Sequence, residues 1–281
     1  MVTRVAFKLR SPETNTEYSI FVAAAREPRS TRPRPAMLLM DGDNQFRPAI
    51  TAYRKLRRAR RIPAMVLVGV GYGAGYGKPA NRRGRDYTPT AHHYEPESGG
   101  ADAFLKFLEY TLWPELVRRY ALHPKIRGIG GHSLGSLLVL HALWRLPLFF
   151  THFLASAPSI WWDNRSILKI TAKRRTRAAT LPAKLFLSAG ERDTESMLRD
   201  LALLERQLVA RPFRELSVTS RRFPQRNHYN VMPDAFREGL IALFSPVDSR
   251  VKARSRPAAQ VTKKSGRRRR KPPARSTSSD G

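Results

Sequence analysis

The feature that most constrains the fold is the run of residues 126–143, IRGIGGHSLGSLLVLHAL. A short strand-like stretch ends in small residues, the pentapeptide GHSLG (131–135) follows, and leucines then repeat at helical spacing. This order predicts a strand, a tight turn with Ser133 at its apex and a helix. Such a nucleophile elbow raises one hydroxyl above the carboxyl end of a parallel sheet.

The chain before this turn fits an α/β sheet. Alternating apolar and polar residues over 4–10 and 17–25 predict an antiparallel hairpin, and the apolar runs 36–40 and 64–70 predict two strands separated by an amphipathic helix. We therefore expect an α/β fold, with a mostly parallel central sheet, an N-terminal antiparallel hairpin and helices on both faces.

Further elements are predicted on either side of the elbow. Residues 101–120 repeat apolar side chains at helical spacing, and Pro114 is expected to bend this helix or to start a second one. Strands are expected at 149–155, 184–188 and 215–219. A last amphipathic helix follows the loop that contains His228.

Length and composition allow a globular enzyme. The chain has 281 residues, of which 41% are hydrophobic, enough to bury a sizeable core. No run approaches the roughly 18 apolar residues of a membrane span, and no apolar signal core follows the N-terminus. The absence of cysteine excludes disulfides, thiol catalysis and thiolate metal sites, and it agrees with a cytoplasmic location.

The positive charge is spread unevenly. The net charge is +30, and the segment 249–281 contributes +11 of it, from twelve Lys or Arg against one Asp. Because this segment has few large apolar residues, it cannot offset its ordering entropy by burial. We expect a hydrolase domain at 1–248 and a disordered basic tail at 249–281, which is either a solvated appendage or a nonspecific contact to nucleic acid or an anionic surface.

Two nucleotide-binding motifs can be excluded. Residues 69–74, GVGYGA, match the dinucleotide fingerprint, but a polar loop follows them where that fingerprint requires a helix. A phosphate loop is excluded because Tyr72 stands where the first glycine should be, and Pro79 replaces the serine or threonine.

Three chemical groups follow strands in an order that suggests catalysis. A serine hydroxyl needs a base within hydrogen-bond reach, usually an imidazole oriented by a carboxylate. Ser133 is followed by acidic residues after the predicted strand 184–188, and then by His228. Taken singly, the serine could be structural, the histidine solvated and Asp193 a helix cap. Together they have the chain order of α/β-hydrolases, whose sites lie at strand carboxyl ends.

Several motifs carry a family resemblance. They are LLMDGD (38–43), RGRDYTPT (83–90), GHSLG, SAPSIWW (156–162) and the loop of His228. In order and spacing they resemble the esterase D-like esterases of the α/β-hydrolase superfamily, and within that group the chain is most similar to the ferric-siderophore esterases. The resemblance spans residues 1–245 and leaves out the basic tail.

The resemblance implies a serine esterase with no metal and no organic cofactor. Ser133 would be the nucleophile and His228 the general base. The backbone N–H groups of Leu134 and Asp43 would form the oxyanion hole. Ser136 stands where many relatives have a second glycine, a change that could crowd the elbow.

The acid is open between two residues. Asp193 fits a G-x-x-D spacing from Gly190, whereas Glu191 fits the G-E pattern common in the siderophore branch. Some members of that branch manage with serine and histidine alone. We favour Asp193 and keep Glu191 as the alternative.

The substrate-binding candidates come from two loops. Arg83, Arg85 and Tyr87 lie in a long aromatic and charged loop, and Trp161 and Trp162 follow the strand next to the elbow. The arginines would favour an anionic ester. The alternative for Arg85 is a local ion pair with the neighbouring aspartate, and for the tryptophans it is core packing.

We therefore predict a serine carboxylic-ester hydrolase that acts through an acyl-enzyme on a small, possibly anionic ester, either siderophore-type or a simple acyl ester. The alternative is a polybasic protein that binds nucleic acid or an anionic surface, on a hydrolase fold with weak or lost activity.

Overall fold

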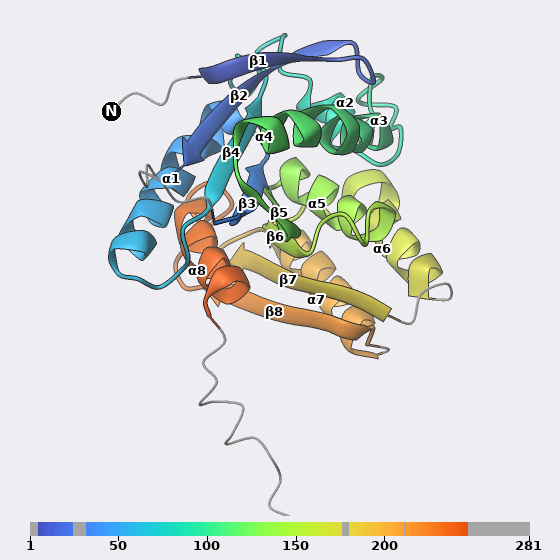
Figure 1. The fold of residues 1–281 in the computed structure, drawn as a ribbon. Coiled ribbons are helices and arrows are strands. Elements are labelled where there is room, and N and C mark those ends of the chain that lie inside the picture. The colour runs from blue at the N-terminus through green and yellow to red at the C-terminus, as the bar shows by residue number, and fades with distance from the viewer. Residues whose placement is uncertain (1–4, 25–31, 176–179, 211, 247–281) are drawn as a thin grey trace, which may run out of the picture. The chain divides into compact units, whose positions relative to one another are not determined.

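The described residues form one mixed sheet. The computed structural model describes residues 5–24, 32–175, 180–210 and 212–246, so the predicted boundary at 248 and the tail 249–281 lie outside them. The strands, in chain order, are β1 (Val5–Ser11), β2 (Thr16–Ala24), β3 (Arg34–Leu39), β4 (Val66–Gly71), β5 (Leu122–His132), β6 (His152–Ser156), β7 (Thr180–Gly190) and β8 (Arg214–Phe223). They are arranged in the order β1-β2-β4-β3-β5-β6-β7-β8 (Figure 1).

The strand directions agree with the sequence prediction. β1 and β2 form an antiparallel hairpin, and β2 also runs antiparallel to β4. From β4 to β8 every neighbouring pair is parallel. The carboxyl ends of β3 to β8 therefore meet at one edge of the sheet, which is where an α/β fold places its site.

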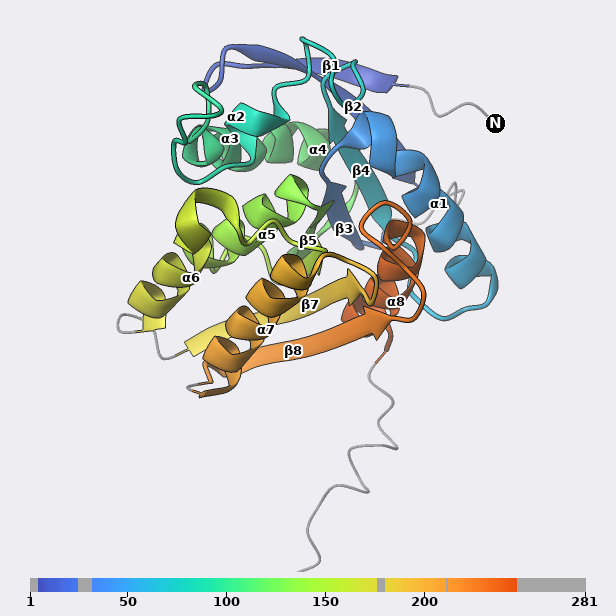
Figure 2. The ribbon, with the colours of Figure 1, turned by 180° about the vertical axis from the view of Figure 1, so that it is seen from behind.

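Helices cover both faces of the sheet. They are α1 (Gly42–Arg58), α2 (Arg83–Asp86), α3 (Ala101–Lys106), the π-helix η1 (Phe107–Leu112), α4 (Trp113–Arg119), α5 (Leu134–Arg145), α6 (Trp162–Arg175), α7 (Glu195–Ala210) and α8 (Met232–Phe244). α1 and α8 contact each other on one face, as Figure 2 shows, and α5, α6 and α7 belong to the core of the other.

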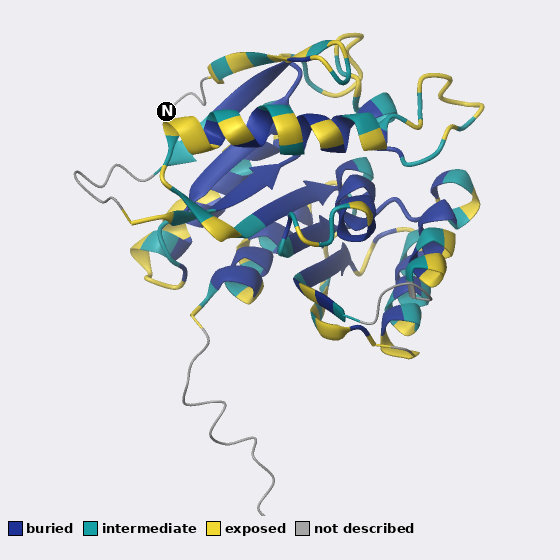
Figure 3. Ribbon diagram, turned by 45° about the vertical axis from the view of Figure 1, so that its right-hand side comes forward, coloured by how far each residue is buried: buried dark blue, intermediate teal, exposed yellow. Residues whose placement is uncertain are grey.

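Side-chain alternation along β3 explains the two layers. Met37 and Leu39 pack with the apolar residues of α1 and α8, whereas Leu38 packs with those of α5 to α7. β4 is buried along its whole length, as expected for a continuous apolar strand in the middle of a sheet. Figure 3 shows this buried centre.

Several elements differ in detail from the prediction. The helix expected over 101–120 is divided into α3, η1 and α4, with Pro114 in the first turn of α4, directly after the π-helix. β6 begins at His152, and β8 extends from Arg214 to Phe223 because its pairing with β7 continues past the apolar residues that suggested it. Among the described residues, no helix has the length and apolar content needed to cross a bilayer.

Candidate active site

Ser133 lies at a sharp turn between β5 and α5. Its backbone angles are φ 59° and ψ −123°, a conformation that costs a residue with a side chain roughly 1–3 kcal/mol. A Cβ on Gly131 would lie 2.4 Å from the backbone of Gly135, so a side chain at position 131 would collide with the first turn of α5. These constraints account for the glycine on the strand side of the turn.

Ser136 stabilises the turn instead of crowding it. Its side chain is fully buried, and its hydroxyl lies 2.8 Å from the carbonyl oxygen of Gly131 and 2.6 Å from that of Ser156. The single hydroxyl proton can be donated to either of these carbonyl oxygens, at the ends of two strands that are also paired through their backbones.

His228 reaches Ser133 from the loop between β8 and α8. Its Nε2 lies 3.1 Å from Ser133 Oγ. Burial lowers the pKa of His228, the charge of Asp193 opposes this shift, and the charge of Arg83 adds to it. A lowered pKa keeps the imidazole neutral near pH 7, the state in which Nε2 can accept a proton.

Asp193 lies in the loop after β7 and is buried. One carboxylate oxygen, Oδ2, accepts the N–H of Gly190 at 3.2 Å. The other, Oδ1, and Nδ1 of His228 are both buried without a hydrogen-bond partner among the described residues. Burial raises the pKa of Asp193, and the charge of His228 opposes that shift. The two side chains are therefore within electrostatic reach, although no hydrogen bond joins them.

Glu191 has a different environment. It is exposed to solvent, and its backbone N–H bonds the carbonyl oxygen of Phe223. Of the two acids that the sequence left open, the structure brings Asp193 into electrostatic contact with His228.

The Asp41-Gly42-Asp43 turn connects β3 to α1 beside the elbow. Asp41 has left-handed backbone angles (φ 56°, ψ 47°), and its carbonyl accepts the N–H groups of Asn44 and Gln45. Asp43 and Leu134 each lie in the first turn of a helix, where N–H groups lack intrahelical acceptors. The Asp43 carboxylate accepts the N–H of Tyr72 at 2.6 Å and also lies against its own N–H.

Arg83 and Tyr87 hold this turn. Arg83 forms a bidentate ion pair with the buried Asp41 carboxylate: Nε lies 2.9 Å from Oδ1, and Nη2 lies 3.0 Å from Oδ2. Tyr87 is fully buried, and its hydroxyl accepts the N–H of Asp41 at 3.0 Å. Both residues had been predicted to bind substrate, and this geometry gives them contacts to the turn; their contact with a ligand stays a prediction.

The other predicted binding residues are divided between surface and interior. Arg85 forms an ion pair with Asp86 at 2.7 Å and donates to Thr16 at 2.8 Å, which agrees with the local pair considered for it. Trp162 is buried and donates its indole N–H to the carbonyl of Thr90. Trp161 is 49% exposed.

Three residues next to Ser133 were not singled out from the sequence. The ring of His132 lies 4.7 Å from that of His228, and its Nδ1 lies 3.2 Å from Ser156 Oγ. Burial, then the charge of His228, lowers the pKa of His132 to about 3, so it stays neutral. Ser159 Oγ lies 3.3 Å from Ser133 Oγ. The sequence signal that could have identified Ser156 and Ser159 is the motif SAPSIWW, which begins at the end of the strand next to β5.

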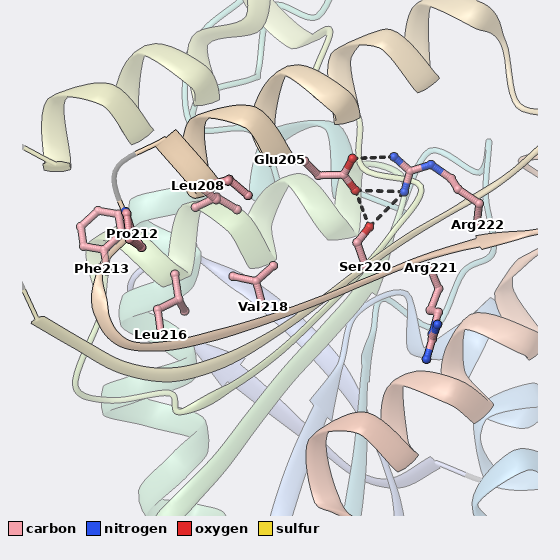
Figure 4. A pocket seen from close by; sticks show the side chains of 10 residues that line it. Glu205, Leu208, Pro212, Phe213, Leu216, Val218, Ser220, Arg221 and Arg222 are labelled. Carbon is pink, nitrogen blue, oxygen red and sulfur yellow. Dashed lines mark hydrogen bonds and ion pairs between the residues drawn. The ribbon is translucent and has the colours of Figure 1, made fainter. Parts of the chain in front are cut away.

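A separate groove lies between α7 and the edge strand β8 (Figure 4). It has a volume of about 780 Å³, and apolar side chains including Leu208, Phe213, Leu216 and Val218 line it. Ser133 and His228 are not among its lining residues. Within the described part of the chain, no group of three or more His, Asp or Glu side chains could hold a metal ion.

Comparisons with known proteins agree with this geometry. The family model described as "Putative esterase" matches residues 11–240. Ferri-bacillibactin esterase BesA of Bacillus subtilis is 33% identical over 252 residues, which cover 80% of this chain and 84% of that protein. Siderophore enterobactin esterase of Emericella nidulans is 36% identical over 175 residues, 55% of this chain and 54% of the relative.

Solved structures with a similar fold cover most of the chain. The BES protein from Bacillus cereus has a TM-score of 0.77 and 26% sequence identity, covering 85% of this chain and 94% of that one. Siderophore hydrolase EstB from Aspergillus nidulans has a TM-score of 0.74 and 23% identity, covering 87% of this chain and 96% of that one. The chain belongs to the "Putative esterase" family, and it is a serine carboxylic-ester hydrolase with the α/β-hydrolase fold.

Proposed function

We propose that Ser133, His228 and Asp193 carry out ester hydrolysis and that the substrate is an aromatic, anionic ester of the ferric-siderophore type. The observation that carries the catalytic assignment is the 3.1 Å contact between Ser133 Oγ and His228 Nε2 at the strained turn. The substrate class has support from the relatives, which include a ferri-bacillibactin esterase and an enterobactin esterase.

The proposed mechanism uses an acyl-enzyme. His228 Nε2 takes the Ser133 proton while Oγ attacks the ester carbonyl. The oxyanion is held by the N–H of Leu134 and by that of Asp43, which lies against its own carboxylate in the resting enzyme. The imidazolium then protonates the leaving alcohol, and water hydrolyses the acyl-enzyme with His228 again as base. Asp193 stabilises the imidazolium through its charge, which opposes the effects of burial and of the Arg83 charge on the pKa of His228.

Exposed aromatic side chains support an aromatic substrate. Among the described residues, four exposed aromatic side chains lie in segments that follow the carboxyl ends of strands; they are Tyr76, Tyr94, Trp161 and Tyr229. Tyr229 is 91% exposed, and its ring lies 5.7 Å from that of His228. Aromatic faces left in water at a site can stack on planar rings such as catechols.

Positive charge at the site supports an anionic substrate. The guanidinium of Arg83 lowers the pKa of both His228 and His132, so its field reaches the base even though it is paired with Asp41. The surplus of Lys and Arg over Asp and Glu in the whole chain acts in the same direction at longer range. No comparison supports the alternative of a nucleic-acid-binding protein, and the tail on which it depends lies outside the described residues.

A substrate panel tests the proposed class. We expect kcat/KM for a ferric tris-catecholate trilactone to exceed that for aryl acetates, and Trp161→Ala to raise KM for the catecholate by about 10-fold through lost stacking. Tyr110→Ala is the matched control, because Tyr110 is an exposed aromatic residue on η1, away from these loops. Equal turnover of both ester classes, with no effect of Trp161→Ala, would refute the substrate proposal.

Replacement of Asp193 tests the acid. We expect Asp193→Asn to lower kcat by about 10²-fold, less than the roughly 10⁴-fold loss at a triad whose aspartate is hydrogen-bonded to the histidine. Glu191→Gln is the control and should retain the wild-type rate, since Glu191 is exposed. Steady-state kinetics on an aryl acetate measures both, and a larger loss in Glu191→Gln would reverse the assignment.

The pH profile tests the state of His228. Because burial lowers the pKa of His228, the free imidazole should persist to lower pH, and the acid limb of kcat/KM should have an apparent pKa below about 6.5. Asp193→Asn should move this limb lower still, since the Asp193 charge raises the pKa. An acid limb above 6.5, or an upward shift in Asp193→Asn, would contradict this description of the base.

A further inference from the structure

We propose that Ser159 is a further catalytic residue, whose hydroxyl donates a hydrogen bond to Ser133 Oγ and stabilises that oxygen as it becomes negative. The inference rests on the proposed function, in which Ser133 is the nucleophile. Ser159 lies in the loop after β6 and is 1% exposed. Its Oγ is 3.3 Å from Ser133 Oγ, so the nucleophile contacts both Ser159 and His228.

The direction of this hydrogen bond follows from the other partner. His228 is neutral near pH 7 because burial lowers its pKa, and a proton on Nδ1, on the side of Asp193, leaves Nε2 as an acceptor. The single Ser133 proton then points to Nε2, at 3.1 Å. Only lone pairs remain on Ser133 Oγ, so the Ser159 hydroxyl is the donor between the two serines.

Backbone contacts hold Ser159 in this position. The Ser159 N–H donates to the carbonyl oxygen of Ser133 at 3.3 Å, and the Ser133 N–H donates to the carbonyl oxygen of Ser156 at 3.0 Å. The last residue of β6 and the loop after it are therefore each joined to Ser133 by a main-chain hydrogen bond. An alanine at position 159 keeps these bonds, so it removes the hydroxyl alone.

The hydroxyl can act more strongly in the transition state than in the resting enzyme. During acylation the Ser133 proton passes to His228 Nε2, and Ser133 Oγ carries partial negative charge until the Oγ–carbon bond is complete and the carbonyl electron pair has moved to the oxyanion. Ser159 keeps its own proton throughout. A hydrogen bond to a charged oxygen is shorter and stronger than one between neutral groups. The rather long resting distance leaves room for this shortening, and a contact that strengthens in the transition state raises kcat.

The same donor assists the second half of the reaction. When water attacks the acyl-enzyme, Ser133 Oγ becomes the leaving oxygen and again carries negative charge before it recovers its proton from His228. Ser159 is within reach of that oxygen throughout. Loss of the hydroxyl should therefore slow acylation and deacylation together.

Ser159→Ala tests the inference. We expect kcat on an aryl acetate and the rate of labelling by a fluorophosphonate each to fall by about 10- to 100-fold, the effect of losing a hydrogen bond to a charged group, with KM changed little. Ser159→Cys keeps the shape of the side chain but is a weaker donor, so its rates should lie between those of Ser159→Ala and the wild type. An unchanged melting temperature would separate this effect from a structural one.

Ser188→Ala is the matched control. Ser188 lies on β7, its side chain is fully buried, and its hydroxyl has no hydrogen-bond partner within the described residues. Loss of the Ser188 hydroxyl should leave kcat on the aryl acetate and the rate of fluorophosphonate labelling unchanged. Wild-type kcat and labelling in Ser159→Ala, or a loss equal in the alanine and cysteine variants that follows a fall in melting temperature, would overturn the inference.

Ser133→Ala separates the two proposals. Turnover that persists in Ser133→Ala would show that the proposed function itself is wrong. An inactive Ser133→Ala variant together with a fully active Ser159→Ala variant would leave the proposed function intact and refute only the role of Ser159.

Discussion

Replacing Ser133 with alanine is expected to lower kcat for aryl acetate hydrolysis by at least about 10⁴-fold and to abolish labelling by a fluorophosphonate. The hydroxyl is the only group at the apex of the turn that can form an acyl-enzyme, and the contact with His228 Nε2 at 3.1 Å depends on it. The substitution should leave the fold intact, because alanine keeps the Cβ of Ser133 and removes only the hydroxyl.

The control for this variant is Ser217→Ala. Ser217 is exposed on β8, where its backbone pairs with Lys184 of β7, well before the carboxyl end of the strand. It should retain full activity and full labelling. Labelling or turnover that persists in Ser133→Ala would place the nucleophile elsewhere and contradict the assignment.

Replacing His228 with alanine is expected to lower kcat by about 10⁴-fold while leaving substrate binding nearly unchanged. Without an imidazole nitrogen within hydrogen-bond distance of its Oγ, Ser133 keeps its proton and is a poor nucleophile near neutral pH. Part of the lost rate should return at high pH, because hydroxide can then remove the proton that His228 takes in the proposed mechanism. Steady-state kinetics from pH 6 to pH 10 measures both effects.

His123→Ala is the comparison for the histidine. His123 lies in the first residues of β5, at the opposite edge of the sheet, where its Nδ1 accepts the N–H groups of Lys125 and Ile126. Its replacement should leave the pH profile unchanged. A His228→Ala variant with the wild-type rate at neutral pH would exclude this residue as the base.

The position of the serine and the histidine could be predicted because local patterns encode them. GHSLG between a strand and a helix specifies the turn, and parallel strands bring the loop of His228 to the same edge of the sheet. The hairpin and the two helical layers followed from the alternation of apolar residues in the same way.

The acid could not be chosen from the sequence, because Asp193 and Glu191 are only two residues apart and both spacings fit. The two side chains differ in burial, which the sequence does not reveal. Burial depends on the path of the loop after β7 and on its backbone bonds to Phe223, at the end of β8, and to Arg226, in the loop that follows. Those contacts join segments more than 30 residues apart, and no local pattern reports them.

The long loop after β4 shows the same limit. Its arginines and tyrosine suggested a rim for substrate, but the ion pair of Arg83 with Asp41 spans 42 residues and the hydrogen bond of Tyr87 to Asp41 spans 46. Once these bonds form, both side chains support the Asp41-Gly42-Asp43 turn. Ser159 was not singled out for a related reason, since its closeness to Ser133 arises only when β6 pairs beside β5.

The most direct test of the account is to identify the residue that becomes covalently modified. Wild-type protein is treated with a fluorophosphonate until hydrolysis of aryl acetate stops, and the adduct is located by mass spectrometry of the digested chain. We expect one adduct per molecule, on the peptide that contains Ser133, with inactivation proportional to labelling. Inactivation with the adduct on another residue, or continued turnover by molecules labelled at Ser133, would contradict it.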